Sequence, residues 1–131
     1  ASTDIAFARG QTILLVEDQT DVRDMAVALL EELGYQIVSV ASPKEALEVI
    51  DSNAEIDLLF TDIVMPGALD GTALASEARA KKPSLPVLFT SGYAERAVFD
   101  EGDFNAADHL LAKPYRADQL AGAVARALGQ R

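Results

Sequence analysis

The stretch Leu58–Pro66, with the sequence LLFTDIVMP, decides how the chain folds. Its apolar run, preceded by Asp57, reaches Asp62, and Pro66 follows four residues later. Short apolar runs that end in turn-forming residues are typical of buried strands. The pattern predicts a strand that ends at Asp62 and presents this carboxylate at the edge of a sheet. Taken alone, Asp62 is equally compatible with a residue that caps a turn or a helix.

Similar apolar segments recur along the chain and predict further strands, at residues 12–16, 37–41, 87–89 and 110–112. Between them, apolar residues recur at spacings of three and four, which is typical of amphipathic helices. These predicted helices span residues 21–33, 43–50, 71–82, 94–100 and 117–128. Apolar strands that alternate with amphipathic helices predict an α/β fold, a doubly wound parallel sheet covered on both faces.

Several helix ends carry their own signals. Gly34 is predicted to end the first helix, whose apolar stripe includes Met25, and Asp21 is interpreted as the acidic cap at its start. Ser42, Pro43 and the glutamate that follows them two residues later form a capping box with proline at the first helical position. These signals fix helix boundaries independently of the apolar spacing.

Composition restricts the class of protein. The 131 residues suffice for one domain, which we assign to residues 12–129 after a tail at residues 1–11. The chain has no cysteine, which excludes disulfides and thiolate metal sites and is compatible with the cytoplasm. Eleven basic and 21 acidic residues give a net charge of −10, which argues against direct binding to nucleic acid. No apolar stretch is long enough to span a membrane.

Polar residues stand at the carboxyl ends of the predicted strands. They are Glu17, Asp18, Asp62, Thr90 and Lys113. The carboxyl ends of parallel strands share one edge of the sheet, so these side chains are expected to converge. Three carboxylates beside one ammonium leave room for a divalent cation, and oxygen-only ligands favour Mg²⁺. A hard cation, a lysine and a hydroxyl around a carboxylate suit phosphoryl transfer, with Asp62 as the nucleophile that forms an acyl phosphate.

Each of these residues also has a purely structural interpretation. Glu17 or Asp18 could cap the first helix and interact with its dipole. Thr90 could simply end a strand, and Lys113 could be a solvated loop residue. Tyr115 fits a packing residue as well as it fits any functional role.

The same residues resemble a receiver domain of a two-component response regulator, the CheY-like family. The resemblance runs from Thr12 to Leu128, and it is carried by the pair Glu17-Asp18, the segment Thr61–Pro66, Thr90, and Lys113-Pro114. It implies a flavodoxin-like, five-stranded parallel sheet in the order 2-1-3-4-5. It also implies a domain that changes its own phosphorylation state and is not a turnover enzyme.

The resemblance implies a role for each site residue. Asp62 would take a phosphoryl group from a histidine kinase or a phosphotransfer protein, assisted by Thr90 and Lys113. The implied Mg²⁺ ligands are Glu17 (mostly through water), Asp18, Asp62 and the backbone carbonyl of Val64. The phosphorylated domain would change conformation and control a downstream protein partner, without contacting nucleic acid or membrane. A homodimer is left open.

The chain departs from the common pattern at three positions. Leu110 stands where many receivers have an aromatic residue on the fifth strand. The segment Leu88–Tyr93 resembles a subset of receivers that lack this aromatic residue and are found in hybrid histidine kinases or as single-domain regulators. We therefore expect switching to use Thr90 and residues 93–107 instead. Val64 and Gly92 stand where polar side chains often orient the hydrolytic water, which predicts slow self-dephosphorylation.

Other functions remain as alternatives. The main one is a receiver-like protein-interaction domain that is never phosphorylated. A flavin- or nucleotide-binding domain would need a glycine-rich loop after the first strand, where the chain has the acidic segment 17–21. An aspartate-based phosphatase would want a second aspartate at Val64.

Overall fold

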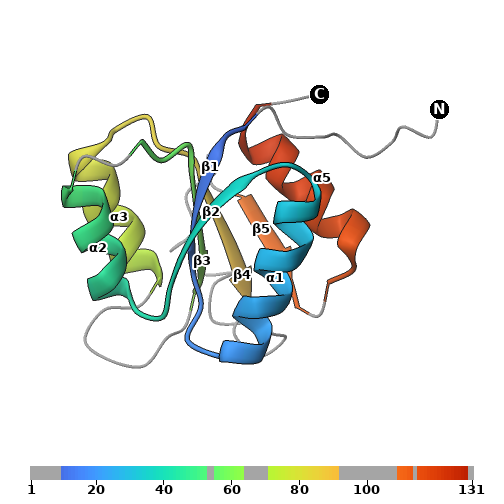
Figure 1. Ribbon diagram of the computed structural model, residues 1–131. Coiled ribbons are helices and arrows are strands. Elements are labelled where there is room, and N and C mark those ends of the chain that lie inside the picture. The colour runs from blue at the N-terminus through green and yellow to red at the C-terminus, as the bar shows by residue number, and fades with distance from the viewer. Residues whose placement is uncertain (1–9, 53–54, 64–70, 92–108, 114, 130–131) are drawn as a thin grey trace.

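The computed structural model describes residues 10–52, 55–63, 71–91, 109–113 and 115–129. Five parallel strands form one sheet in the order β2-β1-β3-β4-β5, which confirms the predicted fold class and strand order. The strands are β1 (Thr12–Val16), β2 (Gln36–Val40), β3 (Leu58–Asp62), β4 (Val87–Ser91) and β5 (His109–Ala112). All of them run downward in Figure 1, so their carboxyl ends lie together at its lower edge.

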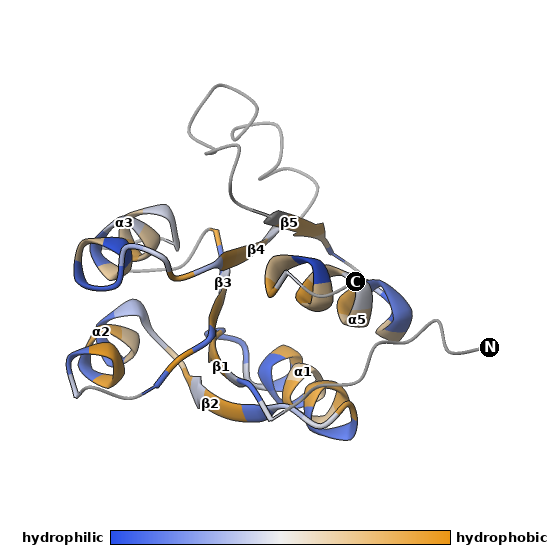
Figure 2. Ribbon diagram, turned by 90° about the horizontal axis from the view of Figure 1, so that it is seen from above, coloured by the Kyte–Doolittle hydropathy of each residue, from blue (hydrophilic) through white to orange (hydrophobic). Residues whose placement is uncertain are grey.

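The described helices cover both faces of the sheet. They are α1 (Thr20–Glu32), α2 (Pro43–Asp51), α3 (Gly71–Lys81) and α5 (Ala117–Ala127). Figure 2 shows α2 and α3 on one face and α1 and α5 on the other. The helix predicted at residues 94–100 and the first nine residues of the predicted tail, 1–11, lie outside the described residues.

Alternation along each strand builds two separate cores. In β3, Leu59 belongs to the cluster under α2 and α3, whereas Leu58 and Phe60 belong to the cluster under α1 and α5. The other central strands alternate in the same way, because successive side chains of a strand point to opposite faces. Both faces of the central strands are therefore buried, as their continuous apolar sequences predict.

The predicted helix ends are largely confirmed. Gly34 has φ of +98°, the left-handed conformation that commonly follows a helix end. Ser42 Oγ accepts a hydrogen bond from the backbone N–H of Glu45 at 3.2 Å. The Glu45 carboxylate reaches back to the N–H of Ala41 at 2.9 Å, one residue before the position expected for a capping box.

One interpretation of the first helix was wrong, and one residue of its apolar stripe is exposed. Asp21 lies in the first turn of α1 and is not its cap, because the helix begins one residue earlier and Gln19 is the N-cap. Met25 belongs to the predicted apolar stripe but is 63% exposed. The stripe is wider than the face of α1 that the sheet covers, and Met25 lies on its edge beside an open groove lined also by Tyr115.

Strand β4 is longer than the sequence predicts. It continues through Thr90 to Ser91, because the N–H of Ile63 donates to the Thr90 carbonyl at 3.0 Å and extends the ladder between β3 and β4. Thr90 therefore pairs directly with Asp62 across the two strands. The two side chains become neighbours at the carboxyl edge.

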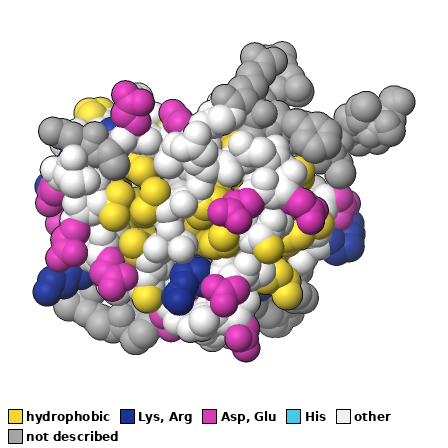
Figure 3. All heavy atoms as spheres, in the orientation of Figure 1, with side chains coloured by type: hydrophobic (Ala, Val, Ile, Leu, Met, Phe, Trp, Pro, Cys, Tyr) yellow, Lys and Arg dark blue, Asp and Glu magenta, His cyan; other side chains and the backbone are white. Residues whose placement is uncertain are grey.

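The described surface is acidic and has no candidate membrane segment. Figure 3 shows aspartate and glutamate side chains spread over one face, with few lysines and arginines among them. Within the part of the chain that the structure describes, no helix is both long and apolar enough to cross a bilayer.

Replacing Tyr35 with phenylalanine is expected to leave the free energy of unfolding unchanged or to raise it by about 1 kcal/mol. Tyr35 is 3% exposed, and its hydroxyl has no hydrogen-bond partner among the described residues. Burial also raises the pKa of this hydroxyl. Urea denaturation measures the difference, and a loss above about 1 kcal/mol would mean that the hydroxyl has a partner in solution.

Candidate acidic site at the carboxyl edge of the sheet

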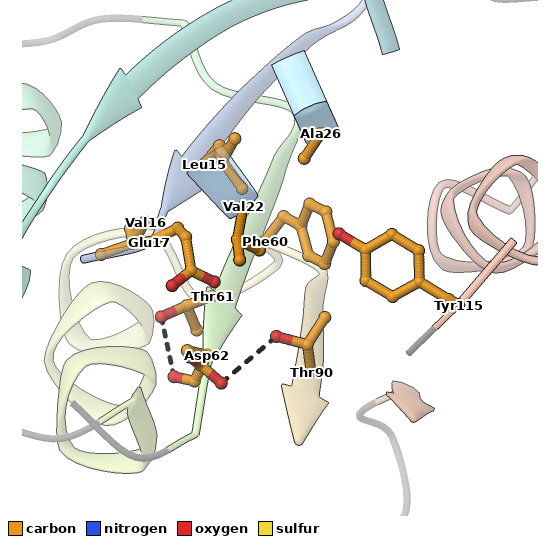
Figure 4. Close-up of a pocket in the computed structure, with 10 residues that line it drawn as sticks. All are labelled: Leu15, Val16, Glu17, Val22, Ala26, Phe60, Thr61, Asp62, Thr90 and Tyr115. Atoms are coloured by element: carbon orange, nitrogen blue, oxygen red, sulfur yellow. Dashed lines mark hydrogen bonds between the residues drawn. The ribbon is translucent and has the colours of Figure 1, made fainter. Parts of the chain in front are cut away.

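The strands direct the predicted site residues to one side of the sheet. Glu17, Asp62 and Lys113 each lie two residues beyond a side chain of the cluster under α1 and α5, namely Leu15, Phe60 and Leu111. Thr90 follows Leu88 of that cluster in the same way. Because side chains alternate along a strand, all four leave the sheet on the side of α1 and α5. Figure 4 shows Glu17, Asp62 and Thr90 facing the same space at the ends of β1, β3 and β4.

Asp62 is the centre of this group and is only 6% exposed. Its Oδ2 accepts a hydrogen bond from Lys113 Nζ at 2.9 Å, and its Oδ1 accepts one from Thr90 Oγ1 at 3.4 Å. The neighbouring Thr61 donates its hydroxyl to the Asp62 carbonyl at 3.0 Å. A nearly buried carboxylate is costly unless charge and hydrogen bonds compensate it, and both are present here.

Lys113 joins the carboxylates of Glu17 and Asp62, which are 45 residues apart in the chain. Its Nζ lies 3.1 Å from Glu17 Oε1 and 2.9 Å from Asp62 Oδ2, and its side chain is 23% exposed. Burial alone would lower the pKa of Lys113, but the hydrogen bonds and negative charges of Asp62 and Glu17 outweigh it and raise the pKa above its usual value. Lys113 is therefore held as a cation and is not a solvated loop lysine.

Glu17 is 4% exposed and uses both carboxylate oxygens. Oε1 binds Lys113, and Oε2 accepts the backbone N–H of Gln19 at 3.1 Å, so Glu17 also supports the start of α1. Glu17 is therefore not the cap of α1, whose N-cap is Gln19, but it holds the residue at which the helix starts. Asp18, beside it, is exposed.

The acidic group fits a divalent cation. Glu17, Asp18 and Asp62 can each offer one oxygen, and these oxygens all lie within 4.8 Å of one another. Oxygens that bind one Mg²⁺ at about 2.1 Å lie within about 4.2 Å of one another, so only a small closure is needed. Of the three carboxylates, only Glu17 and Asp62 bind Lys113 directly. A hard cation would balance the remaining charge. The predicted fourth ligand, the carbonyl of Val64, lies outside the described residues.

Two residues that the sequence analysis did not single out support the site. Arg23 Nη1 donates to the Glu17 carbonyl at 2.9 Å and holds the turn between β1 and α1. Gly71, the first residue of α3, donates its N–H to the Ile63 carbonyl at 2.7 Å. A side chain at Gly71 would collide with the Asp62 carbonyl. Arginine in a first helical turn is too common to reveal such a contact, and a glycine reveals a close approach only once the fold is known.

Comparison with known proteins identifies the family. The sequence profile described as "Response regulator receiver domain" matches residues 13–125. Sensor kinase CckA of Brucella abortus (strain 2308) is 40% identical over 114 residues, which cover 86% of this chain but only 12% of that protein. The response regulator receiver protein CpdR of the same strain is 34% identical over 116 residues, which cover 88% of this chain and 95% of CpdR.

Solved structures agree with the sequence relatives. A response regulator receiver protein from Sinorhizobium medicae WSM419 has a TM-score of 0.82 and 30% identity, covering 92% of this chain and 96% of that one. The receiver domain of the hybrid histidine kinase CckA has a TM-score of 0.74 and 36% identity, covering 89% of this chain and 98% of that one. The sequence, the fold and the relatives agree, and the chain belongs to the response regulator receiver domain family of two-component signal transduction.

Proposed function

We propose that the chain is a phosphoacceptor domain in which Asp62 takes a phosphoryl group from a phosphohistidine. One observation carries the proposal: Lys113 Nζ contacts the buried Asp62 carboxylate at 2.9 Å beside two further carboxylates that could hold a cation. A domain used only for protein binding gains nothing from this arrangement, because burying carboxylates together costs free energy.

In the reaction, one carboxylate oxygen of Asp62 attacks the phosphorus of the donor. The P–N bond of the phosphohistidine breaks, its electron pair stays on the imidazole nitrogen, and a P–O bond forms an acyl phosphate on Asp62. Lys113, already placed on Asp62, would stabilise the negative charge of the transferring group. Thr90, whose hydroxyl points at Asp62, would donate a hydrogen bond to the phosphoryl oxygens.

Mg²⁺ would be held by Asp18 and Asp62, with Glu17 acting through water and the Val64 carbonyl as a further ligand. When bound, the ion supplies charge neutralisation at the phosphoryl oxygens. The observation that supports this assignment is the set of three carboxylate oxygens within 4.8 Å. In this assignment the acceptor carboxylate is also a ligand, so metal and phosphoryl group share one site.

The partners follow from this chemistry. The donor would be a histidine kinase or a phosphotransfer protein, and the phosphorylated state would control a downstream protein in the cytoplasm. We assign the receiver domain to residues 12–129, preceded by a tail. The chain would act on its own phosphorylation state and would not turn over a substrate. It resembles both a single-domain regulator and a part of a sensor kinase.

Incubation with acetyl phosphate and Mg²⁺ is expected to add the mass of one phosphoryl group to the intact wild-type protein. Asp62→Asn should gain no mass, because an amide does not form the acyl phosphate. Asp24→Asn, which removes an exposed carboxylate from α1, is the matched control and should react like the wild type. A wild-type protein that never gains mass would favour the alternative, a receiver-like interaction domain that is not phosphorylated.

The acyl phosphate is expected to persist for minutes or longer in Mg²⁺. Val64 and Gly92 have no polar side chain that could orient a hydrolytic water. Replacing Val64 with asparagine should speed the loss by about 10-fold, less than the about 10²-fold or more of a general acid or base, because an amide only orients the water. Decay of the mass increment after the donor is removed measures both rates. Decay within seconds in the wild type would contradict the prediction.

A further inference from the structure

Tyr115 lies between two spaces that differ in openness. On the inner side is a gap beneath the acidic site, too narrow to admit a water molecule. Glu17, Asp62 and Thr90 are among the residues that line it with Tyr115. On the outer side is an open groove of about 430 Å³, whose lining residues are Asp21, Val22, Met25, Lys113 and Tyr115. Tyr115 and Val22 are the described residues that border both spaces.

The ring of Tyr115 is packed against the core and is sensitive to the charges of the site. It contacts the cluster under α1 and α5, and Figure 4 shows it pointing inward towards Phe60. Burial raises the pKa of its hydroxyl, Lys113 lowers it, and the charges of Glu17 and Asp62 raise it. The hydroxyl of Tyr115 is therefore close enough to the site for the charge of Asp62 to contribute to its pKa.

Leu110, by contrast, does not lie on the face of the sheet where Tyr115 contacts the site. It is partly buried and packs against the cluster under α2 and α3, on the opposite face of the sheet from Tyr115. A leucine also lacks the hydrogen-bonding end and the flat ring of an aromatic switch residue. A conformational change that passes from Thr90 towards α1 therefore depends on a residue other than Leu110.

We propose that Tyr115 is a positioning residue that couples the state of Asp62 to the shape of the groove beside α1. The proposal rests on the proposed function, since it needs a phosphoryl group on Asp62. A phosphoryl group would occupy the space beside Lys113 and draw Thr90 towards it. Thr90 lines the inner gap together with Tyr115, so its movement changes the space on the inner side of the ring. The ring also borders the open outer groove with Met25, so a shift of the ring changes the surroundings of Met25.

The two methionines of the chain make this testable, since a ¹³C-methyl methionine spectrum contains signals only from Met25 and Met65. Met25→Leu assigns them. The site is loaded with Mg²⁺ and beryllofluoride, which imitates an acyl phosphate, and loading is measured separately from the ¹⁹F signal of the bound fluoride. We expect the Met25 signal to shift on loading in the wild type and in Tyr115→Phe, which keeps the ring. In Tyr115→Leu the shift should shrink by at least about threefold.

The same shift in loaded Tyr115→Leu as in the wild type would overturn the proposal while leaving the proposed function intact. Tyr35→Phe is the matched control, and its Met25 response should equal that of the wild type. If Tyr115→Leu does not fold, the ring signal of ¹³C-labelled Tyr115 is measured in the wild type with and without beryllofluoride. A Tyr115 ring signal that does not shift in the loaded protein would refute the coupling. Absence of any ¹⁹F signal, together with no mass gain from acetyl phosphate, would refute the proposed function itself.

Discussion

Gly71→Ala is expected to destabilise the protein and to disturb the acceptor strand at the same time. The first residue of α3 touches the backbone of β3, and a Cβ on Gly71 would meet the Asp62 carbonyl oxygen and carbon and the Cα of Ile63. These atoms are backbone and cannot rotate away. Overpacking of this kind costs about 1–3 kcal/mol or more, and here the strain falls on the residue that carries the acceptor carboxylate.

Urea denaturation and the mass gain from acetyl phosphate measure the two effects. Gly122→Ala is the matched control, because its Cβ would meet only the flexible end of Arg126 at 3.2 Å, inside the helix α5. Alanine in a helix interior is favoured over glycine by about 0.5–1 kcal/mol, so this variant should be as stable as the wild type or more stable. Equal stability of Gly71→Ala and the wild type would show that α3 does not rest on β3 in solution.

Lys113→Met is expected to slow phosphorylation by acetyl phosphate by about 10²-fold, because removing one group that stabilises transition-state charge has an effect of this order. It should also lower the free energy of unfolding without Mg²⁺ by about 2–3 kcal/mol, less than for a fully buried pair because Lys113 is 23% exposed. Saturating Mg²⁺ should restore part of this loss, since the cation binds the same carboxylates. Lys81→Met, which breaks an exposed pair with Asp51, is the control and should leave stability essentially unchanged.

The pH dependence of Lys113→Met gives a second check. The pKa of Lys113 is raised in the folded protein, so its stabilising effect is fully present below the unfolded value of 10.5. The effect is lost as the pH rises through the folded pKa. The difference in unfolding free energy between wild type and variant should therefore be constant up to about pH 10 and shrink above it. A difference that grows with alkaline pH would contradict the ion pair.

Much of the fold follows from short-range patterns in the sequence. The five strands were predicted from their apolar runs, whereas their order followed from the resemblance to receiver domains. The described helix ends at Gly34 and Ser42 follow from left-handed glycine geometry and side-chain capping. The convergence of Asp62, Thr90 and Lys113 could be predicted from the direction of parallel strands alone. The alternation that places them all on the side of α1 and α5 is also readable in the sequence, two residues after each buried apolar side chain.

Other features depend on contacts between distant segments. Thr90 extends β4 because β3 continues beside it, which local preference does not reveal. Met25 fits an apolar stripe but is exposed, because the sheet covers less of α1 than the stripe spans. The positions of Tyr115 and Gly71 matter only through what the fold brings against them. Sequence patterns predicted the elements and the reactive groups, and tertiary packing determines how those groups are connected.

The central claim is that the groups at the carboxyl edge make one carboxylate, Asp62, react with phosphorus. The most direct test is to phosphorylate the wild-type protein with acetyl phosphate and Mg²⁺, reduce the acyl phosphate with borohydride, and sequence the peptides by mass spectrometry. Reduction converts a phosphorylated aspartate into homoserine, and we expect homoserine at position 62 and at no other aspartate. Homoserine at a different aspartate, or none at all in a protein that binds Mg²⁺, would contradict the claim.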